Sequence, residues 1–313
     1  MVSGEFERIA RFFAPLASAE GLGLTDDAAI FVPPEGADMV ITVDQMVESI
    51  HFLPADPANS VARKLLRRNL SDIAAMGATP LHYLLTTALR AETPESWLEC
   101  FVAGLAEDQR LFNISLIGGD STSTMGPISL SVTMFGTVAR GAAWHRRGAR
   151  IGDAVFVTGT IGDAALGLAA AHGKVLDPNG FLAVRRLLPE PRVGLPIHHL
   201  VHACIDVSDG LIQDLGHICR QSDCGALIEA AAVPQSEAAR RAGDQWLSTR
   251  LTGGDDYELL FAAPAEVEIM LRAAAAPVSV TRIGYFVEGP PEVVVLDNAG
   301  NPLPIARGGW SHF

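Results

Sequence analysis

Residues 204–218 read CIDVSDGLIQDLGHI, an apolar segment followed by an acidic turn and an amphipathic segment. This pattern predicts a β-strand over 204–207 and a helix over 211–221, joined by a short turn. Asp206 and Asp209 are therefore expected at the end of a strand, where open α/β sheets bind their ligands. Ser208 and Asp209 could instead simply cap the helix, and for Asp209 the two interpretations stay equally open.

Four further aspartates stand in comparable places, at the end of an apolar run or on a short turn. They are Asp27 in TDDAA, Asp44 after the apolar run 39–43, Asp72 in NLSDIAAMG and Asp120 in SLIGGDST. If several carboxylates converge on one cleft, two of them ~4 Å apart repel by about 4 kcal/mol at an effective dielectric of ~20. Bound cations would offset this repulsion, and all-oxygen ligands favour magnesium over zinc. The pattern predicts phosphate chemistry assisted by magnesium.

Apolar periodicity predicts helices and strands along the whole chain. Helices are expected over 4–13, 60–76, 94–112, 211–221 and 267–275, with Thr93 as the N-cap of the third and a further helix starting at Asp163. Strands are expected over 29–32, 39–43, 81–89, 115–117, 128–138, 154–157, 204–207, 226–229, 257–262, 278–287 and 292–296, with 118–120 as a loop. Mixed elements in both halves indicate an α/β or α+β fold. An arginine- and glycine-rich stretch at 145–153 suggests a boundary between domains 1–148 and 149–313.

The composition restricts the classes of partner. Hydrophobic residues make up 49% of the 313 residues and the formal net charge is −13. An acidic chain is a poor partner for nucleic acid, which requires a basic face. The apolar runs are too short to cross a bilayer, and the first residues lack the apolar core of a signal peptide. Together with four cysteines in no zinc or redox spacing, these features predict a cytoplasmic protein with free thiols.

The number and positions of the lysines exclude two kinds of phosphate-binding site. The chain has only Lys64 and Lys174, and neither lies in a P-loop or a protein-kinase motif. Phosphate binding must therefore use metal ions, backbone N–H groups and arginine. Gly118-Gly119-Asp120 could supply such a site, although by itself an ordinary turn explains it as well.

Three other features are ambiguous when each is taken alone. The segment 253–260, GGDDYELL, is either a turn or a site that faces a substrate. His51 could be an ordinary surface or core histidine, and Trp310 could pack or stack on an aromatic ligand.

Taken together, the motifs resemble one family from end to end. They are GEFERI, DDAA, TVD with the later HF, NLSDIAAMGA, IGGD, VTGTIGD, IDVSDGLIQDLGHI, GGDDYELLF and the terminal GWSHF. The chain resembles the thiamine-monophosphate kinase family, whose superfamily includes aminoimidazole ribonucleotide synthetase and selenophosphate synthetase. The resemblance implies a two-domain aminoimidazole ribonucleotide synthetase-like fold, with an N-terminal domain that forms a β-barrel across a homodimer and a C-terminal α/β domain. It also implies ATP-dependent phosphorylation of thiamine monophosphate, with several magnesium ions and no covalent nucleophile.

The resemblance assigns roles to individual residues. The implied magnesium ligands are Asp27, Thr42, Val43 through its carbonyl, Asp44, Asp72, Asp120, Asp206 and Asp209. The implied ATP contacts are Gly119, Asp120, Arg146 and Ser208, and the implied thiamine phosphate contacts are His51, Asp255 and Trp310. The chain departs from the family at Asp255, where Glu is usual, at Val43, where Thr is common, and at Thr25, where Gly is usual. The alternatives are a ligase or cyclase of the same superfamily and a non-catalytic ATP-binding maturation factor.

Overall fold

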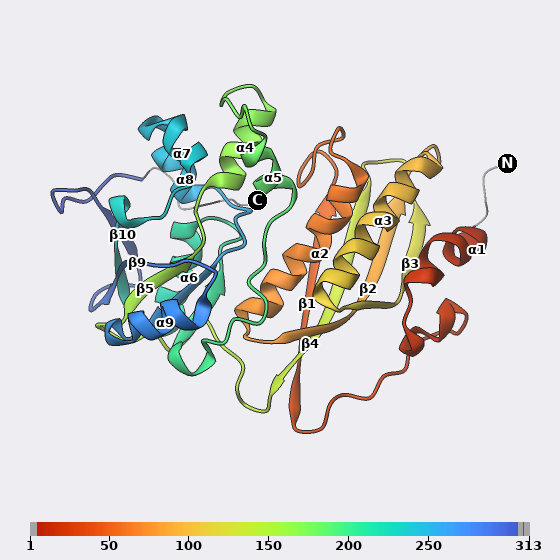
Figure 1. Cartoon of the computed structure of the whole chain (residues 1–313), viewed down its shortest axis with the longest axis horizontal. Coiled ribbons are helices and arrows are strands. Elements are labelled where there is room, and N and C mark those ends of the chain that lie inside the picture. Colours follow the sequence, from red (N-terminus) through yellow and green to blue (C-terminus); the bar gives the residue numbers. More distant parts are fainter. Residues whose placement is uncertain (1–4, 306–308, 310–313) are drawn as a thin grey trace. The chain divides into compact units, whose positions relative to one another are not determined.

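The computed structural model describes residues 5–305 and 309 and divides the chain into two compact units. The first unit consists of Met1–Ile73 and Ala78–Ala142, and the second of Ala74–Gly77 and Ala143–Phe313. Each unit contains one β-sheet with helices packed against it (Figure 1). Among the helices of the described residues, none is long and apolar enough to cross a membrane.

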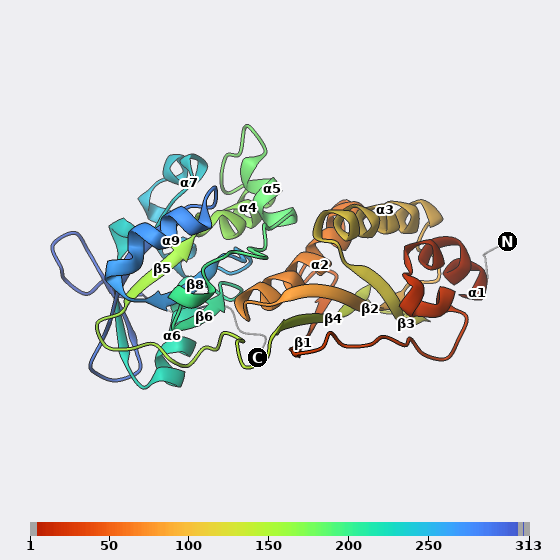
Figure 2. The same ribbon diagram turned by 60° about the horizontal axis from the view of Figure 1, so that its bottom comes forward.

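The first unit is built on a four-stranded sheet in the order β1-β4-β2-β3. Its strands are β1 (Ala37–Val47), β2 (Thr79–Leu89), β3 (Ser115–Ser123) and β4 (Ser129–Ala139), and only the β2–β3 pair is parallel. Its helices are α1 (Glu5–Arg8), α2 (Ala58–Ala75) and α3 (Glu95–Phe112), with short helical turns at Ile9–Phe13, Ala14–Leu16 and Ala19–Leu24. Figure 2 shows α2 and α3 on one face of this sheet and the extended chain before β1 on the other.

Strand alternation places the core of the first unit between the sheet and α2. Leu130, Val132 and Met134 of β4 alternate with half-buried polar residues and are fully buried. Gly136 continues this face and lies against the side chain of Ile73 on α2. The buried side chains that alternate along β4 thus pack against the apolar face of α2 in one layer.

The second unit contains a six-stranded mixed sheet in the order β10-β7-β9-β5-β8-β6. Its strands are β5 (Ala154–Thr158), β6 (Ala203–Asp206), β7 (Gly225–Glu229), β8 (Leu259–Ala263), β9 (Val280–Val287) and β10 (Val293–Leu296). Its helices are α4 (Asp163–Ala171), α5 (Phe181–Leu187), α6 (Leu211–Ser222), α7 (Glu237–Ala242), α8 (Leu247–Thr252) and α9 (Glu268–Ala275). Both faces of the sheet are covered, because Val155 and Val157 of β5 belong to the core with α6, whereas Ala154 and Phe156 belong to the core with α9.

The structure corrects several sequence-based expectations. The strand expected over 29–32 does not form, and this segment instead places the ring of Phe31 5.5 Å from that of His82 and 5.8 Å from that of Phe135. The strand expected over 39–43 continues to Val47, so Asp44 lies inside β1 and not at its end. The expected loop 118–120 is the middle of β3, and the N-cap of α3 is Pro94, not Thr93. At Asp44 and at 118–120, strand pairing over long sequence distances overrides the local signals.

Neither sheet closes into a barrel within one chain. The four-stranded sheet ends at β1 and β3, and the six-stranded sheet ends at β10 and β6. A barrel formed by the first unit would therefore need strands from a second copy.

A buried ion-pair cluster joins α2 to α3 and generates a prediction about stability. Asp108 is fully buried, and its two oxygens accept from Nε of Arg67 at 2.7 Å and from Nε of Arg63 at 2.9 Å. We expect Asp108→Ala to lower the free energy of unfolding by about 3 kcal/mol, because the buried Arg67 would lose its compensating charge.

Urea denaturation followed by circular dichroism would measure this loss. Glu107→Gln is the matched control, since Glu107 binds the same Arg63 at 2.8 Å but has a side chain that is 48% exposed. The control should change stability by about 0.5 kcal/mol or less. Equal effects of the two substitutions would contradict the assignment.

Candidate active site

Three predicted magnesium ligands of the first unit lie together between the sheet and α2. Thr42 and Asp44 are two residues apart on β1 and share the face that meets α2. The hydroxyl of Thr42 donates a hydrogen bond to Oδ2 of Asp72 at 2.5 Å, and Arg68 donates to Oδ1 of Asp44 at 3.1 Å. The side chain of Val43 is 63% exposed and points to the other face, so Val43 could contribute only its carbonyl oxygen, as expected.

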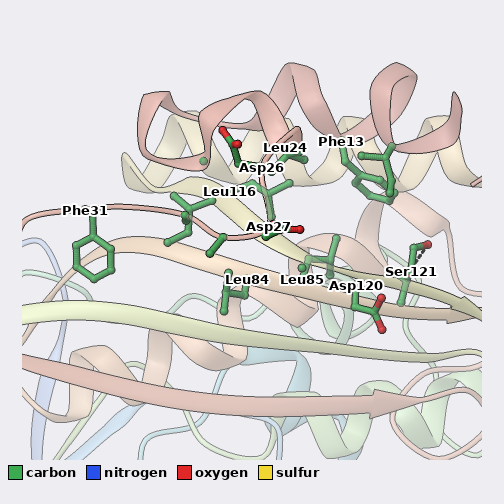
Figure 3. A pocket seen from close by; sticks show the side chains of 18 of the residues that line it. Phe13, Leu24, Asp26, Asp27, Phe31, Leu84, Leu85, Leu116, Asp120 and Ser121 are labelled. Atoms are coloured by element: carbon green, nitrogen blue, oxygen red, sulfur yellow. Dashed lines mark hydrogen bonds between the residues drawn. The ribbon is translucent and has the colours of Figure 1, made fainter. Parts of the chain in front are cut away.

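Two other predicted ligands, Asp27 and Asp120, line one cavity of about 440 Å³ in the first unit. Apolar residues make up most of its wall, among them Phe13, Leu24, Phe31, Leu85 and Leu116. In Figure 3 the carboxylate of Asp27 lies on the side nearer Asp120 and Ser121, whereas that of Asp26 points away from them. The cavity thus combines an apolar wall with two acids at one end, a common composition for a small-molecule site.

Gly119 is required by the close approach of β3 to β2. A Cβ atom at this position would lie 1.9 Å from the carbonyl oxygen of Leu85, its partner in the parallel pair. A Cβ atom at Gly118 would meet only the end of the Leu84 side chain, at 3.1 Å. The glycine therefore keeps the strand paired next to Asp120.

The acidic turn of the second unit, Ser208 to Gly210, is held by Asp214, a residue that the sequence analysis did not single out. The backbone N–H groups of Ser208, Asp209 and Gly210 all donate to Oδ2 of Asp214, each at 3.0 Å. Asp214 is almost fully buried, and burial raises its pKa to about 7. The missed signal was an acid in the first turn of a helix that follows a glycine-containing loop.

The same turn excludes one of the two interpretations of Asp209. The N-cap of α6 is Gly210, which has no side chain that could accept a hydrogen bond from the first turn. Asp209 instead accepts a hydrogen bond from Nε2 of Gln213 at 3.0 Å. Asp206 ends β6 as predicted and is 3% exposed. Helix capping therefore does not account for Asp209.

The GGDDYE segment is hydrogen-bonded to this acidic turn. The N–H of Asp255 donates to the carbonyl of Ser208 at 2.9 Å, and the N–H of Tyr257 donates to that of Val207 at 2.8 Å. Asp255 and Tyr257 both have left-handed backbones, with φ of 71° and 53°. Such conformations are costly for residues other than glycine and often occur at functional sites. The structure thus brings together Ser208, predicted for ATP, and Asp255, predicted for substrate.

Two buried acids hold the strained segment in place. Asp256 accepts from the N–H groups of Gly162 at 2.7 Å and Ala164 at 3.3 Å, and burial raises its pKa well above the usual range. Glu258 is fully buried and accepts from Arg192 at 2.6 Å and from Arg185 at 2.9 Å. These contacts fix the residues on either side of Tyr257. Tyr257 in turn donates its hydroxyl to Oδ1 of Asp255 at 2.8 Å.

His51 is held in one orientation by the backbone of the first unit. Its Nδ1 accepts the N–H of Val47 at 3.0 Å, and the buried Lys64 donates to its carbonyl at 3.4 Å. Because Nδ1 accepts, the neutral ring carries its proton on Nε2. Trp310, the other predicted aromatic contact, lies outside the described residues.

Arg146 is exposed, and its loop is tied to the end of α6. Ser222 accepts the N–H of Gly148 at 3.1 Å and of Ala149 at 3.2 Å, and donates to the carbonyl of Arg146 at 3.4 Å. Burial, followed by the charges of Arg220 and Arg146, lowers the pKa of His217 on α6, while Asp209 opposes this shift. His217 therefore lies within electrostatic range of both Arg146 and Asp209.

The donors present are suited to a hard cation. In the first unit, the cluster of Thr42, Asp44 and Asp72 and the cavity with Asp27 and Asp120 offer mainly carboxylate and hydroxyl oxygens, as does the acidic turn of the second unit. Magnesium prefers such oxygens. Within residues 5–305, no three His, Cys, Asp or Glu side chains come together as a metal site of their own. The acids of these residues instead form smaller groups.

Comparison with known proteins first defines a class. Family models of AIR synthase related proteins match the chain twice, the N-terminal domain model over residues 25–138 and the C-terminal domain model over residues 150–297. A hydrogenase maturation protein HypE in complex with ATP has a TM-score of 0.81 over 97% of this chain and 94% of its own, but is 19% identical, which shows a common fold alone.

Closer relatives then define the family. A thiamine-monophosphate kinase of Caulobacter vibrioides is 43% identical over 98% of this chain and 90% of its own length. The thiamine-monophosphate kinase of Escherichia coli (strain K12) is 40% identical over 100% and 99%. The structure described as "AaThiL complexed with AMPPCP and TMP" is 30% identical, with a TM-score of 0.78 over 99% of this chain and 97% of its own. The chain belongs to the thiamine-monophosphate kinase family of enzymes.

The close approach at Gly119 generates a prediction. Gly119→Ala should lower the free energy of unfolding by about 2 kcal/mol, because overpacking would force β3 away from the Leu85 carbonyl. Thermal unfolding followed by calorimetry would measure the change. Gly118→Ala is the matched control and should have a smaller effect, since only a flexible side-chain end must move. A larger loss for Gly118→Ala would contradict the geometry.

Proposed function

We propose that this enzyme transfers the γ-phosphate of ATP to thiamine monophosphate, giving thiamine diphosphate and ADP, the final step of thiamine diphosphate biosynthesis. The observation that supports this best is the pair of backbone hydrogen bonds between the GGDDYE segment and the acidic turn. They hold Asp255, a predicted substrate contact, beside Ser208, a predicted ATP contact. A transferase with two substrates needs its two sets of contacts in such a fixed relation.

The acids would hold several magnesium ions together with the nucleotide. The proposed ligands of the first unit are Asp27, Asp44, Asp72 and Asp120, with the hydroxyl of Thr42 and the carbonyl of Val43, and those of the second unit are Asp206 and Asp209. When bound there, magnesium would neutralise negative charge on the phosphates. The Thr42 hydrogen bond to Asp72 orients that carboxylate before any ion arrives. Arg68 beside Asp44 similarly reduces the repulsion among the acids.

The transfer itself is a direct in-line displacement. A phosphate oxygen of thiamine monophosphate attacks the γ-phosphorus of ATP, and the bond to the β,γ-bridging oxygen breaks to release ADP. A phosphate monoester has a second pKa of about 6, so the acceptor is already ionised at neutral pH and needs no general base. Arg146, Gly119, Asp120 and Ser208 would contact the nucleotide, whereas His51, Asp255 and Trp310 would contact the acceptor. Label transferred from γ-labelled ATP to the protein would contradict this direct route.

A homodimer is part of the proposal. Ile41 and Val43 are 60% and 63% exposed on β1, which is an edge strand of an open sheet. An apolar edge of this kind is a template for pairing with another chain. We place the β-barrel across two copies, with 1–148 as the ATP- and magnesium-binding and dimerisation domain and 149–313 as the C-terminal α/β domain. Location in the cytoplasm stays a prediction, in keeping with four free cysteines.

The decisive assay combines the purified protein with ATP, magnesium and thiamine monophosphate. We expect equal amounts of thiamine diphosphate and ADP, and loss of both products when EDTA removes magnesium. Asp72→Asn should lower kcat roughly 100-fold, since losing a metal contact worth about 3 kcal/mol corresponds to that change in rate.

Asp38→Asn provides the control, because Asp38 lies on β1, the strand that carries Thr42 and Asp44, but accepts the N–H of Gly141 in an exposed turn, at 2.7 Å. Its kcat should match that of the unchanged protein. ADP formation with another acceptor but not with thiamine monophosphate would assign the enzyme to another reaction of the superfamily.

Asp255 should determine affinity for the acceptor. Asp255→Asn removes a charge and leaves the hydrogen-bonding geometry largely intact, so KM for thiamine monophosphate should rise roughly 10-fold while KM for ATP changes little. Steady-state kinetics with each substrate varied in turn would show this. A change in KM for ATP alone would instead place Asp255 at the nucleotide.

A further inference from the structure

Helix α6 contacts two separate loops that the proposed function assigns to the nucleotide. Its first turn carries Asp214, whose Oδ2 accepts the N–H groups of Ser208, Asp209 and Gly210 at 3.0 Å each. Three donors on one buried oxygen leave the turn little freedom. The side chains of Ser208 and Asp209 remain only partly buried and so stay available to a ligand.

The last turn of α6 holds the second loop. Ser222 accepts the N–H groups of Gly148 and Ala149 at 3.1 and 3.2 Å and donates to the carbonyl of Arg146 at 3.4 Å. Arg146 itself is exposed, so its backbone, and not its guanidinium group, is what the helix fixes. The loop is thereby pinned on both sides of Arg147.

The helix sets the distance between the two loops. Asp214 and Ser222 differ by eight in residue number, which corresponds to about 12 Å along a helix. The buried residues Leu215, Ile218 and Cys219 pack α6 into the core of the second unit, so this spacing is rigid. Between the two ends, His217 lies within electrostatic range of Arg146 and Asp209.

We propose that α6 is the positioning element of the nucleotide site, with Asp214 holding the turn that carries Ser208 and Asp209 and Ser222 holding the loop that carries Arg146. This inference rests on the proposed function. Asp214 and Ser222 are positioning residues, since each acts through backbone groups and neither needs to touch ATP. The site is then preorganised before the nucleotide arrives, which lowers the entropy lost on binding.

Binding and hydrogen exchange test the proposal without relying on turnover. The probe is the ATP analogue AMPPCP with magnesium, measured by calorimetry, and amide exchange is followed by mass spectrometry. Asp214→Ala should weaken AMPPCP binding about 10-fold and speed exchange at residues 208–210. Asp214→Asn keeps an accepting oxygen, so its AMPPCP affinity and exchange rate should fall between those of Asp214→Ala and the unchanged protein.

Ser222→Ala should speed exchange at residues 148–149 and weaken AMPPCP binding several-fold, while KM for thiamine monophosphate stays unchanged. Ser222→Thr keeps the hydroxyl and should restore both properties. Asp223→Asn is the matched control, because Asp223 is an exposed C-cap residue with a left-handed backbone that Asn tolerates well. It should behave like the unchanged protein.

Two results would overturn the inference. One is unchanged AMPPCP affinity in Asp214→Asn and Ser222→Ala, the variants that decide the matter if Asp214→Ala does not fold. The other is faster exchange spread over the whole second unit, which would assign both residues to general stability. Failure of the unchanged protein to bind AMPPCP would reject the proposed function instead, so the two failures are distinguishable.

Discussion

Backbone hydrogen bonding to the buried carboxylate of Asp214 is the interaction on which the site of the second unit depends. It shapes the turn from Ser208 to Gly210, and the carbonyl groups of this region then receive the N–H groups of Asp255 and Tyr257. The strained backbones of those two residues persist because several such bonds determine them together. One buried oxygen thus influences the contacts predicted for both substrates.

Five acids of this chain illustrate two physical situations. Asp108, Asp256 and Glu258 are buried and satisfied by arginines or backbone N–H groups, which makes them structural. Asp27 and Asp120 line a cavity, where their oxygens remain available to a cation. A carboxylate withdrawn from water needs a partner within the protein, whereas one at a cavity can receive its partner with the ligand. A net charge of −13 alone does not separate the groups.

The ends of α2 and α6 were predicted from the sequence better than those of β1 and β3, for a physical reason. The periodicity of α2 and α6 predicts their ends to within two residues, because the apolar stripe of a helix is local information. The extension of β1 through Asp44 and the inclusion of Gly119 in β3 depend on partners far away in the sequence. An isolated run of residues does not reveal such partners, so the predicted strand end and loop were wrong.

By itself the sequence determined the fold class, the family and the identity of the acids, because motif content and hydrophobic patterning are properties of the chain alone. The tertiary structure decided which of these residues meet. It showed that the hydroxyl of Thr42 donates a hydrogen bond to Asp72 and that helix capping does not explain Asp209. It also revealed the role of Asp214, which no motif had singled out. Hydrogen bonds join atoms that folding brings together, and their partners are set by packing rather than by residue type or spacing.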